Sequence, residues 1–182
     1  MAHLLGPRTS TAFLSTCPPH QDAEPPKRPP GLVINLPVEY TAFCLLYQDR
    51  YLRYARARLA DPGLSRRLVE TALGKVATNW ASVLASHCPA AEAWTILGSV
   101  ITAAAHRSTA AGAGSCNAVY RILSTLQADI VTLRHGLSLS EEQAADLMGV
   151  EEPVVACQLR MAHRNLPREL AHALSAAPGA ET

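Results

Sequence analysis

The stretch that decides the fold is LQADIVTLRHGLSLSEEQAADLMGVEEPVVACQLRMAHRNL, residues 126–166. Apolar residues recur in it at helical spacing and predict three short helices. We expect the first of these to end at Gly136 and to bury Ile130, Leu133 and Leu137. The buried positions of the second are Ala144, Ala145, Leu147 and Met148, and those of the third are Val154, Val155, Leu159, Ala162 and Leu166.

The residues between these helices predict where each begins and ends. Ser140 stands before two glutamates and Gln143, the pattern of an N-cap with a capping box. Gly149 can end the second helix in the left-handed conformation of a sharp turn. Pro153 suits the first turn of the next helix. Two amphipathic helices joined by a tight turn predict a helix-turn-helix, the unit that many proteins place in the DNA major groove.

Composition favours helices throughout the chain. Of the 182 residues 48% are hydrophobic, but only 5% are aromatic, and few segments alternate with the period of a strand. The 16 basic and 15 acidic residues nearly cancel, so global charge predicts neither nucleic-acid nor membrane binding. Arginines gather locally, however, at 50, 53, 56, 58, 66 and 67. The arginines from 50 to 58 would form either a solvated helix face or a stripe that attracts nucleic acid.

Cysteine usage and the N-terminus indicate the compartment. The five cysteines are an odd number without a CxxC pair, which argues against a disulfide framework or a structural zinc site. No apolar run is long enough to span a bilayer, and residues 1–17 lack the charged start and apolar block of a signal peptide. We therefore expect a cytoplasmic protein.

The sequence divides into an arm and two small helical domains, an all-α architecture. Seven of the thirteen prolines lie in the first 36 residues, a composition that predicts disorder. Helices are expected at about 38–60, 65–86 with Ser65 as its cap, 90–107 and 117–126, with Trp80 and Trp94 in the core. The expected parts are the arm 1–36, a first domain 37–107, a linker 108–116, a second domain 117–174 with the helix-turn-helix, and a frayed tail 175–182.

Both domains contain residues in an order typical of one protein family. In the first they are Phe43, Tyr47, Tyr51 and Tyr54, then Leu68-Val69-Glu70 with Asn79-Trp80, then Ala93-Trp94. In the second they are Leu133-Arg134, Gly136-Leu137-Ser138, Ala144-Ala145, Leu147-Met148-Gly149-Val150, Val155 and Leu159. Over residues 38–170 this order resembles the small two-domain sigma-70-family factors of bacterial RNA polymerase, the extracytoplasmic-function type.

The resemblance implies two binding surfaces. The second helix of the first domain would dock on core RNA polymerase through Leu68, Val69, Glu70 and Leu73. The third helix of the second domain would contact promoter DNA through Gln158, Arg160, His163 and Arg164, of which Gln158 could pair with adenine. An anti-sigma or other regulatory protein is a further possible partner.

The residues depart from the family where contacts matter most. Arg66-Arg67 stand where the family has acids, and residues 68–117 carry only Glu70, Lys75, Glu92 and Arg107 as formal charges. Residues 137–166 hold five acids against two arginines, an unusual balance for a DNA-reading unit. Two hypotheses follow: a divergent sigma factor that directs polymerase to promoters, or a sigma-derived regulatory module that acts through protein contacts without promoter melting.

An enzyme is not expected. The seven histidines are scattered, and no catalytic spacing, glycine-rich phosphate loop or carboxylate pair stands out. We therefore expect no catalytic residues, cofactor or metal site, and a structural role for each histidine. Lone Cys157 is interpreted as a neutral replacement on the reading helix.

Overall fold

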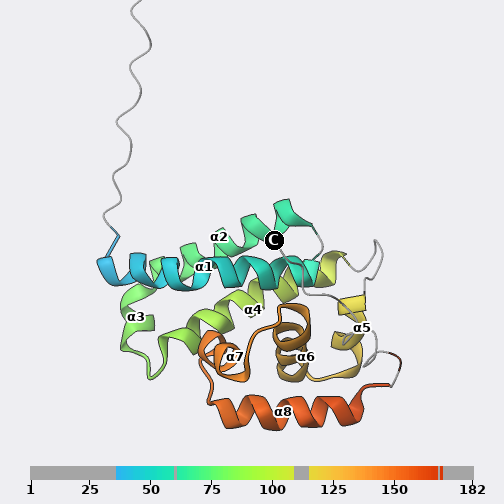
Figure 1. The fold of residues 1–182 in the computed structure, drawn as a ribbon. Helices are drawn as coiled ribbons and strands as arrows, with labels where there is room; N and C mark the ends of the chain where they lie inside the picture. The colour runs from blue at the N-terminus through green and yellow to red at the C-terminus, as the bar shows by residue number, and fades with distance from the viewer. Residues whose placement is uncertain (1–35, 60, 109–114, 168, 170–182) are drawn as a thin grey trace, which may run out of the picture. The chain divides into compact units, whose positions relative to one another are not determined.

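The computed structural model describes residues 36–59, 61–108, 115–167 and 169. These residues form helices and connecting turns and include no strand, which confirms the all-α class (Figure 1). The arm up to residue 35, linker residues 109–114 and the tail lie outside the described residues. No helix in the described ranges has the length and apolar character needed to cross a membrane.

α1 spans Val38–Leu59, close to the expected bounds, and buries a stripe of aromatic side chains. Tyr40, Phe43, Tyr47, Tyr51 and Tyr54 recur every three or four residues, so they share one face of the helix. That face packs against α2 (Pro62–Thr78) and α4 (Pro89–Ser108). The two tryptophans are in the core, as expected: Trp80 contacts Tyr40 and Phe43, and Trp94 contacts Tyr51 and Tyr54.

The helix expected at 65–86 begins earlier and is divided. Asp61, not Ser65, is the N-cap of α2: its Oδ1 accepts hydrogen bonds from the backbone N of Gly63 and Leu64, at 2.9 and 3.0 Å. Ser65 already lies inside the helix, where its hydroxyl donates to the Asp61 carbonyl. At the other end Asn79 leaves helical geometry and separates α2 from α3 (Trp80–Ala85). The Asn79 side chain donates to the Lys75 carbonyl, a local bond that competes with continued helix.

The second half of the chain contains shorter helices. The expected helix at 117–126 is replaced by α5 (Ser115–Ile122) and the start of α6 (Thr125–Val131), because the Ser124 side chain accepts from the Gln127 N and caps α6. A π-helical turn, η2 (Thr132–Gly136), continues α6 and ends at the expected residue. α7 (Glu141–Met148) and α8 (Glu152–Asn165) follow.

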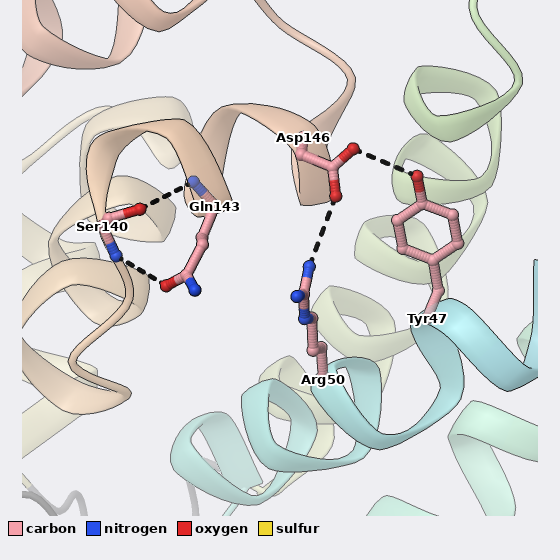
Figure 2. Close-up of polar contacts among 5 residues, drawn as sticks. All are labelled: Tyr47, Arg50, Ser140, Gln143 and Asp146. Atoms are coloured by element: carbon pink, nitrogen blue, oxygen red, sulfur yellow. Dashed lines mark hydrogen bonds and ion pairs between the residues drawn. The ribbon is translucent and has the colours of Figure 1, made fainter.

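The turns around α7 form as predicted. Ser140 Oγ accepts from the Gln143 N, and Gln143 Oε1 accepts from the Ser140 N, a complete capping box (Figure 2). Gly149 has a φ of 65°, the left-handed conformation. Pro153 lies in the first turn of α8. The expected buried positions of α7 are all buried, and so are those of α8 except Val154.

The two halves expected as separate domains pack directly on each other. One compact unit contains all the described helices, and one core cluster includes side chains from α1 to α8. α4 packs against α7, and the Gly149 backbone lies so close to Ala91 that no side chain fits between them. The turn before α8 is therefore also a point of contact between the halves.

Gly149→Ala should destabilise the protein strongly. The added Cβ would overlap the backbone of Ala91, and the left-handed conformation alone costs about 1–2 kcal/mol for a residue other than glycine. The matched control is Gly74→Ala in α2, where a Cβ meets nothing within 4 Å and helix propensity favours alanine by about 0.5–1 kcal/mol. Urea unfolding should show a lower free energy of unfolding for Gly149→Ala and a slightly higher one for Gly74→Ala. Equal midpoints would refute the close packing at Gly149.

Candidate functional site

α8 packs on α6 and α7 through its buried face and leaves its opposite face open (Figure 1). Val155, Leu159 and Ala162 anchor it in the core. Of the four residues predicted to contact DNA, Arg160, His163 and Arg164 are exposed and Gln158 is half-buried. Gln158 and His163 also make contacts with α6 and η2.

Gln158 and His163 are held by neighbouring side chains. The Gln158 side-chain carbonyl accepts from Gln127 Nε2 at 3.2 Å, so bidentate pairing with adenine would require this bond to break. The imidazole Nε2 of His163 lies 3.1 Å from Nε2 of His135 in η2. The four predicted residues therefore lie together on α8. Arg160 and Arg164 are better placed to contact phosphate than Gln158 and His163 are to contact bases.

The open face of α8 carries an apolar stripe beside these arginines. Val154 is 37% exposed and Met161 42% exposed, and Cys157 lies between them at helical spacing. Arg160 and Arg164 lie next to this stripe. Such a face can bind phosphate through little more than two charged side chains, but it presents apolar area that a partner protein could cover.

The Asp146 side chain on α7 is bound by two residues of α1. Its two carboxylate oxygens accept from Tyr47 Oη at 3.4 Å and from Arg50 Nη1 at 3.3 Å (Figure 2). One of the five acids of residues 137–166 is therefore partly neutralised by an ion pair at the surface of the protein. The acidic balance counted from the sequence overstates the repulsion that DNA would meet.

The residues predicted to bind polymerase lie on different faces of α2. Val69 and Leu73 are only 3% and 7% exposed, because α2 packs against both α1 and α4. Tyr40 Oη also donates to the Leu73 carbonyl at 2.9 Å. Val69 and Leu73 therefore belong to the core and expose little surface to a partner. Leu68 is half-buried and Glu70 is exposed, so these two remain candidates.

The arginines of α1 are neither a solvated face nor a nucleic-acid stripe as a group. Arg50 binds Asp146, and Arg53 donates to the Leu137 carbonyl at 3.3 Å. Arg58 is buried, with its guanidinium carbon 3.3 Å from the centre of the Tyr120 ring. Arg56 is exposed, and within the described part of the chain it has no hydrogen bond or ion pair to the second half. The arginines of α1 therefore serve mainly to hold the two halves together. Their spacing in the sequence alone could not indicate this role.

Sequence reasoning missed a buried polar cluster between the halves. Asp129 Oδ1 accepts from Tyr54 Oη at 2.5 Å and from Tyr120 Oη at 2.6 Å. Burial raises the pKa of Asp129, while the two hydroxyls and Arg58 act in the opposite direction. Burial likewise raises the pKa values of Tyr54 and Tyr120, so both hydroxyls keep their protons and donate. The sequence feature that could have indicated this cluster is an acid, Asp129, among the apolar residues of α6.

Tyr54→Phe should cost about 1–3 kcal/mol of unfolding free energy, because it removes a hydrogen bond to a buried acid. Tyr51→Phe is the matched control on the same face of α1, since the buried Tyr51 hydroxyl has no hydrogen-bond partner among the described residues. Removing that hydroxyl should be neutral or slightly stabilising. Denaturant titrations measure the free energy of unfolding of both variants. Equal losses of this free energy would show that the Asp129 cluster contributes nothing specific.

The His135–His163 pair predicts a pH dependence of stability. Burial, the neighbouring His163 and Arg134 together lower the pKa of His135. The unfolded chain then binds protons more readily at this residue, so its contribution to stability is present above the unfolded histidine pKa of about 6.5 and is lost as pH falls below it. Between pH 7.5 and 5.5, the free energy of unfolding should change less steeply with pH in His135→Gln than in the wild type. Exposed His87→Gln is the control and should keep the wild-type slope.

The sequence matches no protein-family model and no curated protein. The relevant features are the open face of α8, the outer side of α2, and the contacts that join the halves.

Proposed function

We propose that the chain is a sigma-factor-like transcription initiation protein that binds bacterial core RNA polymerase and directs it to promoters through weakened DNA contacts. The observation that carries this proposal is the α7–Gly149–α8 unit. A capped short helix and a left-handed glycine turn present the second helix with its outer face open. This is the arrangement that a major-groove reading helix requires.

Promoter contact would come mainly from Arg160 and Arg164, which are exposed on the same helix. Two arginines supply few phosphate contacts, so affinity and its salt dependence would both be small. His163 would add a contact only by leaving His135. Sequence discrimination by this helix alone would be modest, and polymerase would have to supply most of the binding free energy.

Polymerase contact is assigned to the outer side of α2. Leu68 and Glu70 are accessible there, together with the exposed pair Arg66-Arg67. This charge pattern suits a partner surface that is acidic near the start of α2. In this proposal polymerase performs the catalysis, so the chain is not an enzyme and needs no cofactor, and it works in the cytoplasm. An anti-sigma or other regulatory protein would be a further partner.

The second candidate is a sigma-derived regulatory module that acts through protein contacts. The apolar stripe Val154, Cys157 and Met161 on the open face of α8 favours it, because a DNA-reading face is normally polar and basic. The bonds from Tyr47 and Arg50 to Asp146 favour it as well, because they hold α7 against α1. A module of this kind would bind polymerase or another regulator without melting DNA.

Co-purification of the full chain with bacterial core polymerase, followed by transcription from a promoter library, separates the two candidates. Promoter-specific transcripts that depend on the chain would support the first. Stable polymerase binding without transcripts would exclude the first and support the second. Absence of polymerase binding would refute the first and would restrict the second to a module that binds another regulator.

Duplex DNA binding by the full chain should depend weakly on salt. We expect a slope that corresponds to about one to three phosphates, and the double variant Arg160→Ala/Arg164→Ala should bring it near zero. Arg56→Ala removes an exposed arginine from α1 and is the matched control that should leave the slope unchanged. Fluorescence anisotropy over a salt series measures all three proteins. A steep slope that survives the double variant would place the DNA contacts elsewhere.

A further inference from the structure

Two imidazoles from different elements meet at the surface between η2 and α8. Nε2 of His135 and Nε2 of His163 are 3.1 Å apart. Their ring centroids are separated by 5.3 Å, and the ring planes are inclined by 42°. Neither the polymerase contact nor the phosphate contacts proposed above use this arrangement.

The backbone on both sides of the pair is fixed by the fold. η2 is closed by hydrogen bonds from the Leu137 N to the Thr132 carbonyl and from the Leu139 N to the Leu133 carbonyl. Arg134 also donates to the Leu139 carbonyl. On α8, Leu159 and Ala162 are buried next to His163. The two rings are therefore brought together by helix packing and not only by their attraction for each other.

We propose that His135 and His163 form a chelating site for a divalent late first-row transition-metal ion of the zinc, nickel or copper type. Imidazole nitrogen is a preferred ligand of these ions. Two nitrogens bound at about 2.0–2.1 Å in a tetrahedral site are about 3.3 Å apart. The observed 3.1 Å separation therefore allows one ion to be bound by both rings after a small movement.

The chemistry around the pair sets the character of the site. Imidazole binds a metal ion in its neutral form. No third His, Cys, Asp or Glu of the described residues completes a ligand group, so water would fill the remaining positions. The guanidinium of Arg134 opposes a bound cation. The site should therefore be weaker than a three- or four-ligand site and open to exchange.

A bound ion would connect η2 to α8 and hold His163 away from DNA. This effect on DNA is the only part that depends on the proposed function; metal binding itself can be measured without DNA or polymerase. The alternative occupant of the same nitrogens is a proton shared in a direct hydrogen bond between the two neutral rings. The experiment must distinguish these two.

The test is titration of the full chain with Zn²⁺, and separately with Ni²⁺, in competition with a chromophoric chelator. We expect one saturable equivalent and a higher thermal midpoint for the wild type. Both should be lost in His163→Gln and in His135→Gln, and both should persist in the control His87→Gln. No saturable binding by the wild type, or equal binding by the double variant His135→Gln/His163→Gln, would overturn the proposal.

A spectroscopic readout on the wild type protects the test from variants that fail to fold. Electron paramagnetic resonance of the Cu²⁺-loaded protein should show two imidazole nitrogens bound to one ion. Coupling to a single imidazole would contradict chelation by the pair.

Discussion

The structure depends first on the burial of one carboxyl group, that of Asp129. An acid inside a protein costs several kcal/mol unless hydrogen bonds compensate it. Here two tyrosine hydroxyls, one from α1 and one from α5, donate to the same oxygen, and the Arg58 guanidinium lies over the second tyrosine ring. α1, α5 and α6 must stay together to keep these partners in place. The contacts of Arg50 and Arg53 then extend the same junction toward α7.

This junction decides which surfaces are left for partners. The arginines of α1 would have been the natural source of attraction for nucleic acid, but most of them are used internally. What remains is the outer side of α2 and the open face of α8, where two arginines accompany an apolar stripe. A protein with these surfaces would depend on a partner protein for most of its binding, and DNA would contribute a smaller part.

Local signals predicted the helix boundaries around α7 and the start of α8 well. The capping box at Ser140, the turn at Gly149 and Pro153 in the first turn of α8 each depend on residues within a few positions of one another. The Asp129 cluster could not be predicted in the same way, because Tyr54 and Asp129 are 75 positions apart. The burial of Val69 and Leu73 could not be predicted for a related reason: the sequence shows an apolar stripe on α2, but not that α1 and α4 cover it.

Native-state hydrogen exchange at increasing denaturant tests most directly whether the halves are one cooperative unit. If the Asp129 cluster joins them, the buried amides of α1 around Tyr54 and those of α6 around Ile130 should exchange through the same global opening, with equal free energies and equal denaturant dependence. Exchange of α6, α7 and α8 through a separate opening of lower free energy, while α1 stays protected, would contradict the account.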